Sequence, residues 1–411
     1  MKNYNIINII RNLSFGILIL SSLFFVACED DNDGTYKMTK GLPEVYYVRL
    51  SNPDLADSLL IGAFMEQSIC LIGNNLTSIQ EVYFNDQKAV LNQNFITSEV
   101  LMVTVPKTIP EDVTNKIYMV TENKDTVDYN FKVLVPSPII GSMKCEYVID
   151  GDIAVINGDY FLDDPNIPLK VVFAGNVQAN DIISITKNEI QVRVPEGSQE
   201  GPVTITSLYG SGRSSFYFRD SRGIFLDMDR TTAAGSWNPG NYANTNPDGI
   251  DGNYQLFEGT LKSWGTWSSA FFFHYWGKED VSTLDPTKSV LKFEFNCLNP
   301  WLGIPMFMMF EPEVGPDGRN PYIDDGDFKP AQCHWKPYAD TGSYQTDGWI
   351  TVTIPLTEFK YNTGESENDR KVTTFTGMRS FFMGFWGALP DGIDSNDIKM
   401  CVDNIRIVPT E

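Results

Sequence analysis

A repeat within the first half of the chain limits its fold more than any other feature. Residues 69–76 resemble residues 153–161, and residues 101–106 resemble residues 190–195, at a spacing of about 85 residues. Each copy consists of short runs in which apolar and polar side chains alternate, and Gly, Asn, Asp and Pro separate these runs. Runs of this kind are typical of the strands of β-sandwiches. The sequence therefore predicts two β-sandwiches in succession.

The rest of the chain departs from the repeat but keeps the β pattern. Residues 290–297 alternate strictly, so that Lys292 and Glu294 lie on the face opposite the apolar side chains. Residues 349–356 alternate in the same way. We expect the face with Lys292 and Glu294 to be exposed to solvent. We expect the whole region to form a larger jelly-roll-like β-sandwich.

The predicted fold class is therefore all-β, with a joint at the Pro136-Ser137-Pro138 segment, where proline stiffens the chain. The predicted parts are a signal peptide, an acidic linker, two repeated sandwiches and the larger sandwich, at residues 1–27, 28–40, 41–135, 136–220 and 221–411.

The amino terminus predicts export and lipid attachment. The apolar stretch of residues 13–27 is shorter than the roughly 20 residues that span a membrane and is typical of a signal peptide. It ends in Phe25-Val26-Ala27-Cys28, which resembles the lipobox of bacterial lipoproteins, with Phe25 in place of the usual Leu. The acidic run of residues 29–34 resembles the export signal of Bacteroidetes surface lipoproteins. These resemblances imply a lipid on Cys28 and an outer-membrane, cell-surface location; a signal peptide followed by a chance Cys and a charged linker is the alternative.

Charge limits the class of ligand. The formal net charge is −22, so the chain lacks the basic surface that nucleic acid requires, and an anionic polysaccharide would be repelled. A neutral ligand is the natural partner. Apart from Cys28, the five cysteines are widely spaced, which indicates neither a dense disulfide framework nor a zinc site.

Aromatic residues concentrate in the third region. All eight tryptophans lie between Trp237 and Trp386, and tyrosine and phenylalanine surround several of them. Trp offers a large flat apolar face with a polar N–H, and a sugar ring offers a matching apolar face with hydroxyl groups around its rim. This distribution predicts a platform for a flat, uncharged ligand such as a saccharide, which must be exposed to solvent.

The pattern of residues 271–276 separates the platform from the core. Alternation places Phe272, His274 and Trp276 on one face, with Trp276 at its rim, while Tyr275 can turn outward at the end of the strand. Trp349 begins a regular strand and is interpreted as core, and Trp386 fits either location. The predicted ligand-binding residues are Trp276, Trp237, Tyr275, Trp335, Trp301, Trp264 and Trp267.

Three carboxylates suggest a possible metal. Asp227 and Asp229 lie near the start of the third region and Asp403 near its end. If the first and last strands are neighbours, these carboxylates could hold a structural Ca²⁺, which prefers oxygen ligands. Ordinary acids on an edge strand are the alternative, and binding is expected to require no cofactor.

The order of the segments resembles a known family. Residues 41–220 resemble tandem immunoglobulin-like IPT/TIG modules, and residues 348–359 and 402–407 resemble strands of jelly-roll carbohydrate-binding modules. With the lipobox and acidic leader, the whole chain resembles the surface glycan-binding proteins of Bacteroidetes polysaccharide-utilisation loci, of the type called B, with its xyloglucan-binding-like domain. The resemblance implies capture of a neutral polysaccharide, xyloglucan first, beside a SusC-like porin and a SusD-like lipoprotein, with the repeated sandwiches as spacers.

Enzymatic motifs are lacking. A glycosidase needs two carboxylates across the scissile bond, and acids such as Glu279, Asp280 and Glu311 are too numerous to specify a pair. The sequence contains no GxSxG, HExxH or P-loop, and its only histidines are His274 and His334. It therefore predicts a non-catalytic binding protein, with a surface adhesin for a protein partner or a glycoside hydrolase as alternatives.

Overall fold

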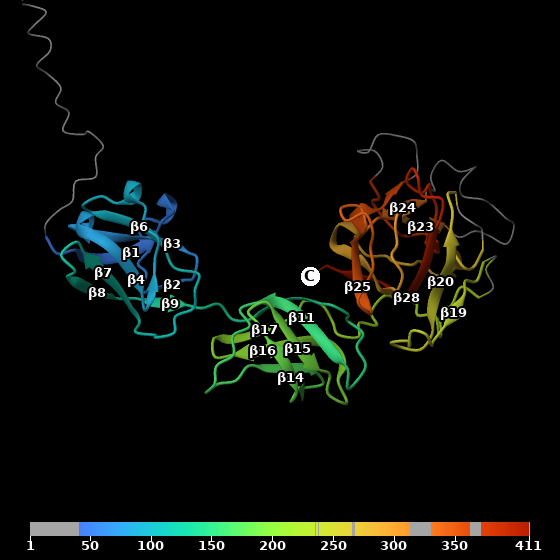
Figure 1. Cartoon of the computed structure of the whole chain (residues 1–411), viewed down its shortest axis with the longest axis horizontal. Helices are drawn as coiled ribbons and strands as arrows, with labels where there is room; N and C mark the ends of the chain where they lie inside the picture. The colour runs from blue at the N-terminus through green and yellow to red at the C-terminus, as the bar shows by residue number, and fades with distance from the viewer. Residues whose placement is uncertain are drawn as a thin grey trace, which may run out of the picture. The chain divides into compact units, whose positions relative to one another are not determined.

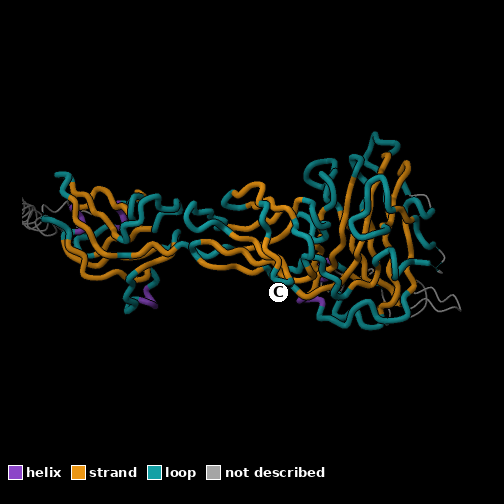
Figure 2. Tube along the Cα trace, turned by 90° about the horizontal axis from the view of Figure 1, so that it is seen from below, coloured by secondary structure: helices purple, strands orange, loops and turns teal. Residues whose placement is uncertain are grey.

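The computed structural model describes residues 41–234, 236, 238–264, 268–312, 330–361 and 371–410. The chain divides into two compact units, Met1–Val135 and Pro136–Glu411. Strands dominate both units (Figures 1 and 2), which confirms the all-β prediction. Cys28 and the signal peptide lie outside the described residues. Within the described ranges, no helix has the length and apolar character needed to cross a membrane.

The first unit holds one sandwich. Its three-stranded sheet has the order β1-β3-β6 and its four-stranded sheet the order β5-β4-β7-β8, while β2 pairs in parallel with β9. A single apolar cluster draws side chains from both sheets, including the edge-to-face pair Phe84 and Phe131. The strands are β1 (Glu44–Leu50), β2 (Gly62–Phe64), β3 (Ser68–Asn74), β4 (Ile79–Phe84), β5 (Gln87–Lys88), β6 (Val100–Thr104), β7 (Lys116–Thr121), β8 (Thr126–Asn130) and β9 (Lys132–Leu134).

The second unit begins with a sandwich of the same kind. Its two four-stranded sheets have the orders β10-β11-β15-β14 and β13-β12-β16-β17, and they enclose a core that includes Phe173 and Phe218. The strands are β10 (Ile139–Met143), β11 (Ile153–Asp159), β12 (Lys170–Ala174), β13 (Val177–Gln178), β14 (Ile182–Ile185), β15 (Glu189–Arg193), β16 (Gln199–Ser207) and β17 (Gly210–Arg213).

Two glycines explain why the repeat is visible in the sequence. Gly73 lies near the end of β3, next to the neighbouring strand β1. A Cβ at this position would lie 1.9 Å from the carbonyl oxygen of Glu44. Gly158 has the corresponding position in β11, where a Cβ would lie 2.0 Å from the carbonyl oxygen of Ile139. In both sandwiches the neighbouring strand is bulged next to this contact. Only glycine permits so close an approach, so both copies require it.

The second unit continues into the larger sandwich. One sheet has the order β19-β20-β28-β22-β25, with β18 also paired to β28; we call it the six-stranded sheet. The other, the five-stranded sheet, has the order β21-β27-β23-β24-β26. The largest apolar cluster fills the space between them. The strands are β18 (Ile224–Leu226), β19 (Tyr242–Ala243), β20 (Tyr254–Leu261), β21 (Phe272–Trp276), β22 (Ser289–Cys297), β23 (Met306–Pro312), β24 (Ala331–Trp335), β25 (Ile350–Pro355), β26 (Lys360–Tyr361), β27 (Met378–Phe385) and β28 (Asn396–Pro409).

The predicted wet face of β22 is buried, which corrects the sequence analysis. All nine residues of β22 are buried, including Lys292 and Glu294. The reason is that the second sandwich supplies Glu146, whose carboxylate lies 2.5 Å from Lys292 Nζ. Strict alternation identified the two faces correctly, but the polar face meets a charged partner instead of water.

A buried ion cluster therefore joins the second sandwich to the larger one. Arg406 on β28 is fully buried and donates to Glu294 Oε2 at 2.7 Å and to Glu146 Oε2 at 2.8 Å. Burial opposes the charge of the guanidinium, but the two carboxylates outweigh it and raise the pKa of Arg406. Thr351 donates to Glu294 and accepts from the backbone of Glu146. Each charge in the cluster is bonded to an opposite charge, so loss of one member leaves a buried charge without its partner.

Glu146→Gln should destabilise the second unit strongly. Neutralising this carboxylate leaves Lys292 and Arg406 undercompensated in a buried environment, a change that typically costs about 3–5 kcal/mol. Asp347→Asn is the matched control, because it removes the exposed ion pair with Lys144 and should cost less than about 1 kcal/mol. Denaturant unfolding measures both. Equal effects of the two substitutions would contradict the role given to the cluster.

Asp403 gives the larger sandwich a characteristic pH dependence. Burial raises the pKa of its carboxyl to about 9, with a further upward contribution from Glu294. The unfolded carboxyl titrates near pH 4, so the folded state binds more protons between about pH 4 and 9 and loses stability as the pH rises through that range. In Asp403→Asn this loss should disappear. Thermal unfolding of both proteins from pH 5 to pH 9 tests it; parallel profiles would contradict the assignment.

Candidate functional site

The outer face of the five-stranded sheet carries a surface of aromatic side chains. Phe271 and Phe273 point into the core, as the alternation predicted, so Phe272, His274 and Trp276 lie on the opposite face. Strand register brings further residues into line with these three on β27, β23 and β24: Ser380, Phe382, Gly384, Phe307, Met309, Glu311, Gln332 and His334.

Trp276 is oriented by two buried polar side chains. Its side chain is 39% exposed, and its indole Nε1–H donates to His274 Nδ1 at 3.1 Å. The other ring nitrogen, His274 Nε2, lies 2.7 Å from Glu311 Oε2, and both His274 and Glu311 are buried. An Nδ1 that accepts a hydrogen bond has no proton, so the imidazole proton lies on Nε2, facing the carboxylate. Glu311 thus lies beside the protonated nitrogen of His274, and His274 holds the edge of the indole by accepting its N–H.

Further aromatic side chains lie on the same face of the five-stranded sheet, beyond His274. Phe272 and Phe382 are stacked with ring centroids 5.3 Å apart, and together with Met309 they form a small apolar cluster separate from the main core. Phe307 packs beside this cluster and meets His334 edge to face at 4.9 Å. Phe272, Met309 and Phe382 are buried, so this part of the face is a packed apolar cluster that supports the exposed rings and is not itself a stacking surface.

Polar groups lie beside Trp276. The backbone of Gly277 donates to the carbonyl of Arg379, whose guanidinium donates to Asp280 Oδ1 at 3.1 Å. This hydrogen bond lowers the pKa of Asp280. Both side chains are partly exposed, so the pair can exchange hydrogen bonds with hydroxyl groups of a ligand. Sequence analysis missed Arg379, because only the pairing of β21 with β27 places its backbone against Gly277, the residue after Trp276.

One of the predicted platform residues belongs to the core, and two others pack against it. Trp301 is fully buried and donates from Nε1 to the carbonyl of Ile304 at 2.8 Å. Trp335 is half-buried and packs edge to face against Phe295, with ring centroids 5.0 Å apart. Tyr275 is half-buried against the core. The prediction for Trp301 is therefore wrong, whereas Trp335 and Tyr275, which keep part of their surface exposed, remain predictions. Proline and polar neighbours suggested loops, but alternation along 331–335 points Trp335 inward and His334 outward.

The remaining tryptophans divide into two groups. Trp264 and Trp386 are exposed and meet edge to face, with ring centroids 6.1 Å apart. Trp349 is half-buried, and its Nε1 donates to the carbonyl of Asp248 at 3.2 Å. The predictions for Trp237 and Trp267 fall outside the described residues.

The three predicted calcium ligands have other hydrogen-bond partners in the structure, and the calcium site stays a prediction. Asp227 accepts three backbone N–H groups of the following turn and pairs with Arg230, and Asp229 accepts from Asn253. Asp403 is buried and accepts from the backbone N–H of Asn404 at 2.7 Å. Across the described ranges, no three acidic, histidine or cysteine side chains are grouped so that they could hold a metal.

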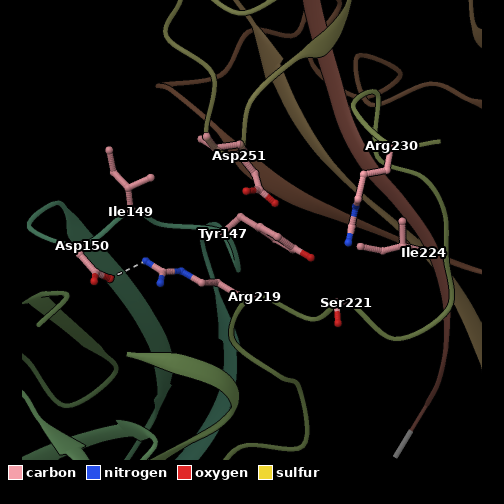
Figure 3. A pocket seen from close by; sticks show the side chains of 9 residues that line it. Tyr147, Ile149, Asp150, Arg219, Ser221, Ile224, Arg230 and Asp251 are labelled. Carbon is pink, nitrogen blue, oxygen red and sulfur yellow. Dashed lines mark hydrogen bonds and ion pairs between the residues drawn. The ribbon is translucent and has the colours of Figure 1, made fainter. Parts of the chain in front are cut away.

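A polar hollow of about 360 Å³ lies where the second sandwich meets the larger one (Figure 3). Its cationic groups are already engaged, Arg219 with Asp150 at 2.7 Å and Arg230 with Asp227 at 2.8 Å. Its one aromatic side chain is buried. The hollow therefore lacks an exposed aromatic ring comparable to Trp276. Its lining is Tyr147, Ile149, Asp150, Arg219, Ser221, Ile224, Arg230, Ile250 and Asp251.

Comparisons with known proteins agree with this architecture. Residues 218–409 match the family model described as surface glycan-binding protein B xyloglucan binding domain. A surface glycan-binding protein of Prevotella bryantii has a similar crystal structure, with a TM-score of 0.70 and 29% sequence identity over 90% of this chain and 99% of that one. An IPT/TIG domain-containing protein of Bacteroides ovatus is 31% identical over 158 residues, which are 37% of this chain and 31% of the relative. The match thus spans about a third of that curated relative's length.

His274→Phe should free the indole N–H of Trp276 without removing the flat ring beside it. The Nε1–H loses its acceptor, so its resonance should move upfield and its exchange with solvent should accelerate. The measurement is a ¹H–¹⁵N spectrum with the indole signal assigned through Trp276→Phe. The Trp349 indole, which donates to a backbone carbonyl, is the internal control. An unchanged Trp276 signal would contradict the proposed hydrogen bond.

Proposed function

We propose that this protein binds a neutral polysaccharide without cleaving it, because residues 218–409 match the family model described as surface glycan-binding protein B xyloglucan binding domain. Xyloglucan is the first candidate ligand. The observation that carries the proposal is the exposed indole of Trp276, oriented by His274 and Glu311 on the outer face of the five-stranded sheet.

The chemistry of this face suits a sugar chain. The apolar side of a sugar ring covers the indole, and this burial contributes about 25 cal/mol per Å² of apolar area. Hydroxyl groups at the rim find donors and acceptors in Arg379 and Asp280. Holding the indole in place before binding lowers the conformational entropy lost on binding. The formal charge of −22 repels an anionic chain and leaves a neutral one unaffected.

The same residues support binding without catalysis. A glycosidase places two carboxyl groups on either side of a scissile bond. Glu311 is buried and directed at His274, and His274 in turn accepts from Trp276, so this set serves to orient an aromatic ring. Asp280 is paired with Arg379, and its lowered pKa is unfavourable for a general acid.

We also propose that the protein is a lipoprotein on the outer face of the outer membrane, anchored through Cys28. The proposal is supported by the lipobox-like 25–28 segment and the acidic run that follows it. In this arrangement the two smaller sandwiches act as spacers, and the bound polysaccharide is held near a SusC/SusD-like uptake complex. A surface adhesin for a protein partner is the competing function, since exposed aromatic rings also serve protein interfaces.

Trp276→Ala should weaken binding of xyloglucan at least about tenfold, a loss of about 1.4 kcal/mol. The free protein loses little stability, because the indole lies at the rim of the sheet. Calorimetry with xyloglucan measures the affinity, and Tyr46→Ala, an exposed aromatic residue of the first sandwich, is the control and should bind like the wild type. Reducing-end release during the same incubation reports hydrolysis. Failure of the wild type to bind any neutral glycan would favour the adhesin, and release of reducing ends would favour a hydrolase.

A further inference from the structure

Trp264 is held in an unfavourable conformation and exposed to solvent. Its φ of +65° lies in the left-handed region, which bulky side chains rarely adopt, and its side chain is 61% exposed. Exposure of so large an apolar ring and a strained backbone both lower stability. The fold accepts both at one residue, which indicates that the position of the indole matters for something other than folding.

Two hydrogen bonds join the loop of Trp264 to the loop that follows β27. The backbone N–H of Trp264 donates to the carbonyl of Gly387 at 2.6 Å, and that of Leu389 donates to Ser263 Oγ at 3.0 Å. Gly387 has a φ of +150°, a conformation that glycine adopts freely and other residues do not. The paired loops bring Trp264 against Trp386, at an interplanar angle of 67°.

Strand alternation places Trp386 on the same face as Trp276, and Trp264 lies against Trp386. Phe385 points into the core, so Trp386, the next residue, points to the outer face, where it is 38% exposed. Trp276 pairs with Ser380 on β27, six residues before Trp386. Six residues of an antiparallel strand span about 20 Å. The outer face therefore has exposed tryptophan at both ends, with the buried pair Phe272 and Phe382 between them.

We propose that Trp264 and Trp386 form a second saccharide-stacking site, so that the ligand is an unbroken chain of several sugar residues that crosses the outer face from one end to the other. This inference rests on the proposed function and adds the length of ligand required. The two rings form a corner: one sugar ring lies flat on one indole while its edge meets the other. Each stacking contact is modest, and two contacts on one chain reinforce each other through effective concentration.

Trp264→Asn and Trp386→Ala, combined in the full-length protein, test the proposal. Asn tolerates the left-handed region, so the substitution at Trp264 should leave the melting temperature unchanged or raise it. The double variant should bind xyloglucan polymer about tenfold more weakly than the wild type. It should bind a trisaccharide of the glucan backbone, too short to reach both ends, like the wild type. Ile393→Ala, an exposed apolar residue of the same sandwich, is the control.

Three results overturn the proposal. Polymer affinity equal to that of the wild type would show that the pair does not contact the chain, while the proposed function would stand if Trp276→Ala still weakened binding. Equal weakening for short and long ligands would place the pair within the Trp276 site and not at a second one. If the wild type binds neither ligand, the proposed function fails, and the second stacking site fails with it.

Discussion

The burial of Arg406 determines which face of the larger sandwich is available to a ligand. A two-sheet sandwich has two outer faces, and on the six-stranded sheet one of them presents Lys292, Glu294 and Arg406. Glu146 of the second sandwich bonds to two of these and covers the face. A buried ion cluster of this kind needs a closed, well-fitted surface. The outer face of the five-stranded sheet is thus left for function, and it carries the oriented tryptophan.

The sequence was sufficient for the architecture because strand signals are local. Alternation identified the strands and, in residues 271–276, assigned each side chain to the correct face. Gly73 and Gly158 marked the repeat for a steric reason, since a Cβ at either position would collide with a neighbouring carbonyl. Both features depend on residues close together along the chain or on a single close contact.

The site was predictable only in part, because exposure depends on contacts distant in sequence. Lys292 and Glu294 alternate with apolar residues, as on a solvent-exposed face of a strand. They are buried because Glu146 of the second sandwich packs against this face. Trp301 has the flanking residues of a loop, yet its indole is enclosed between the sheets. The hydrogen bond from Trp276 to His274 links residues on one strand, but the partner of His274, Glu311, comes from β23, and no local pattern connects them.

The two ends of the outer face achieve the same purpose by different physical means. At one end Trp276 is held by a hydrogen bond to the buried His274, which lies beside the buried Glu311. At the other end backbone geometry orients Trp264, through a left-handed residue and hydrogen bonds between loops. A single stacked ring holds a sugar weakly, so a face for a long neutral chain gains affinity by repeating the contact along the chain. Rigid rings are what makes this repetition effective, because each one is already positioned when the next sugar arrives.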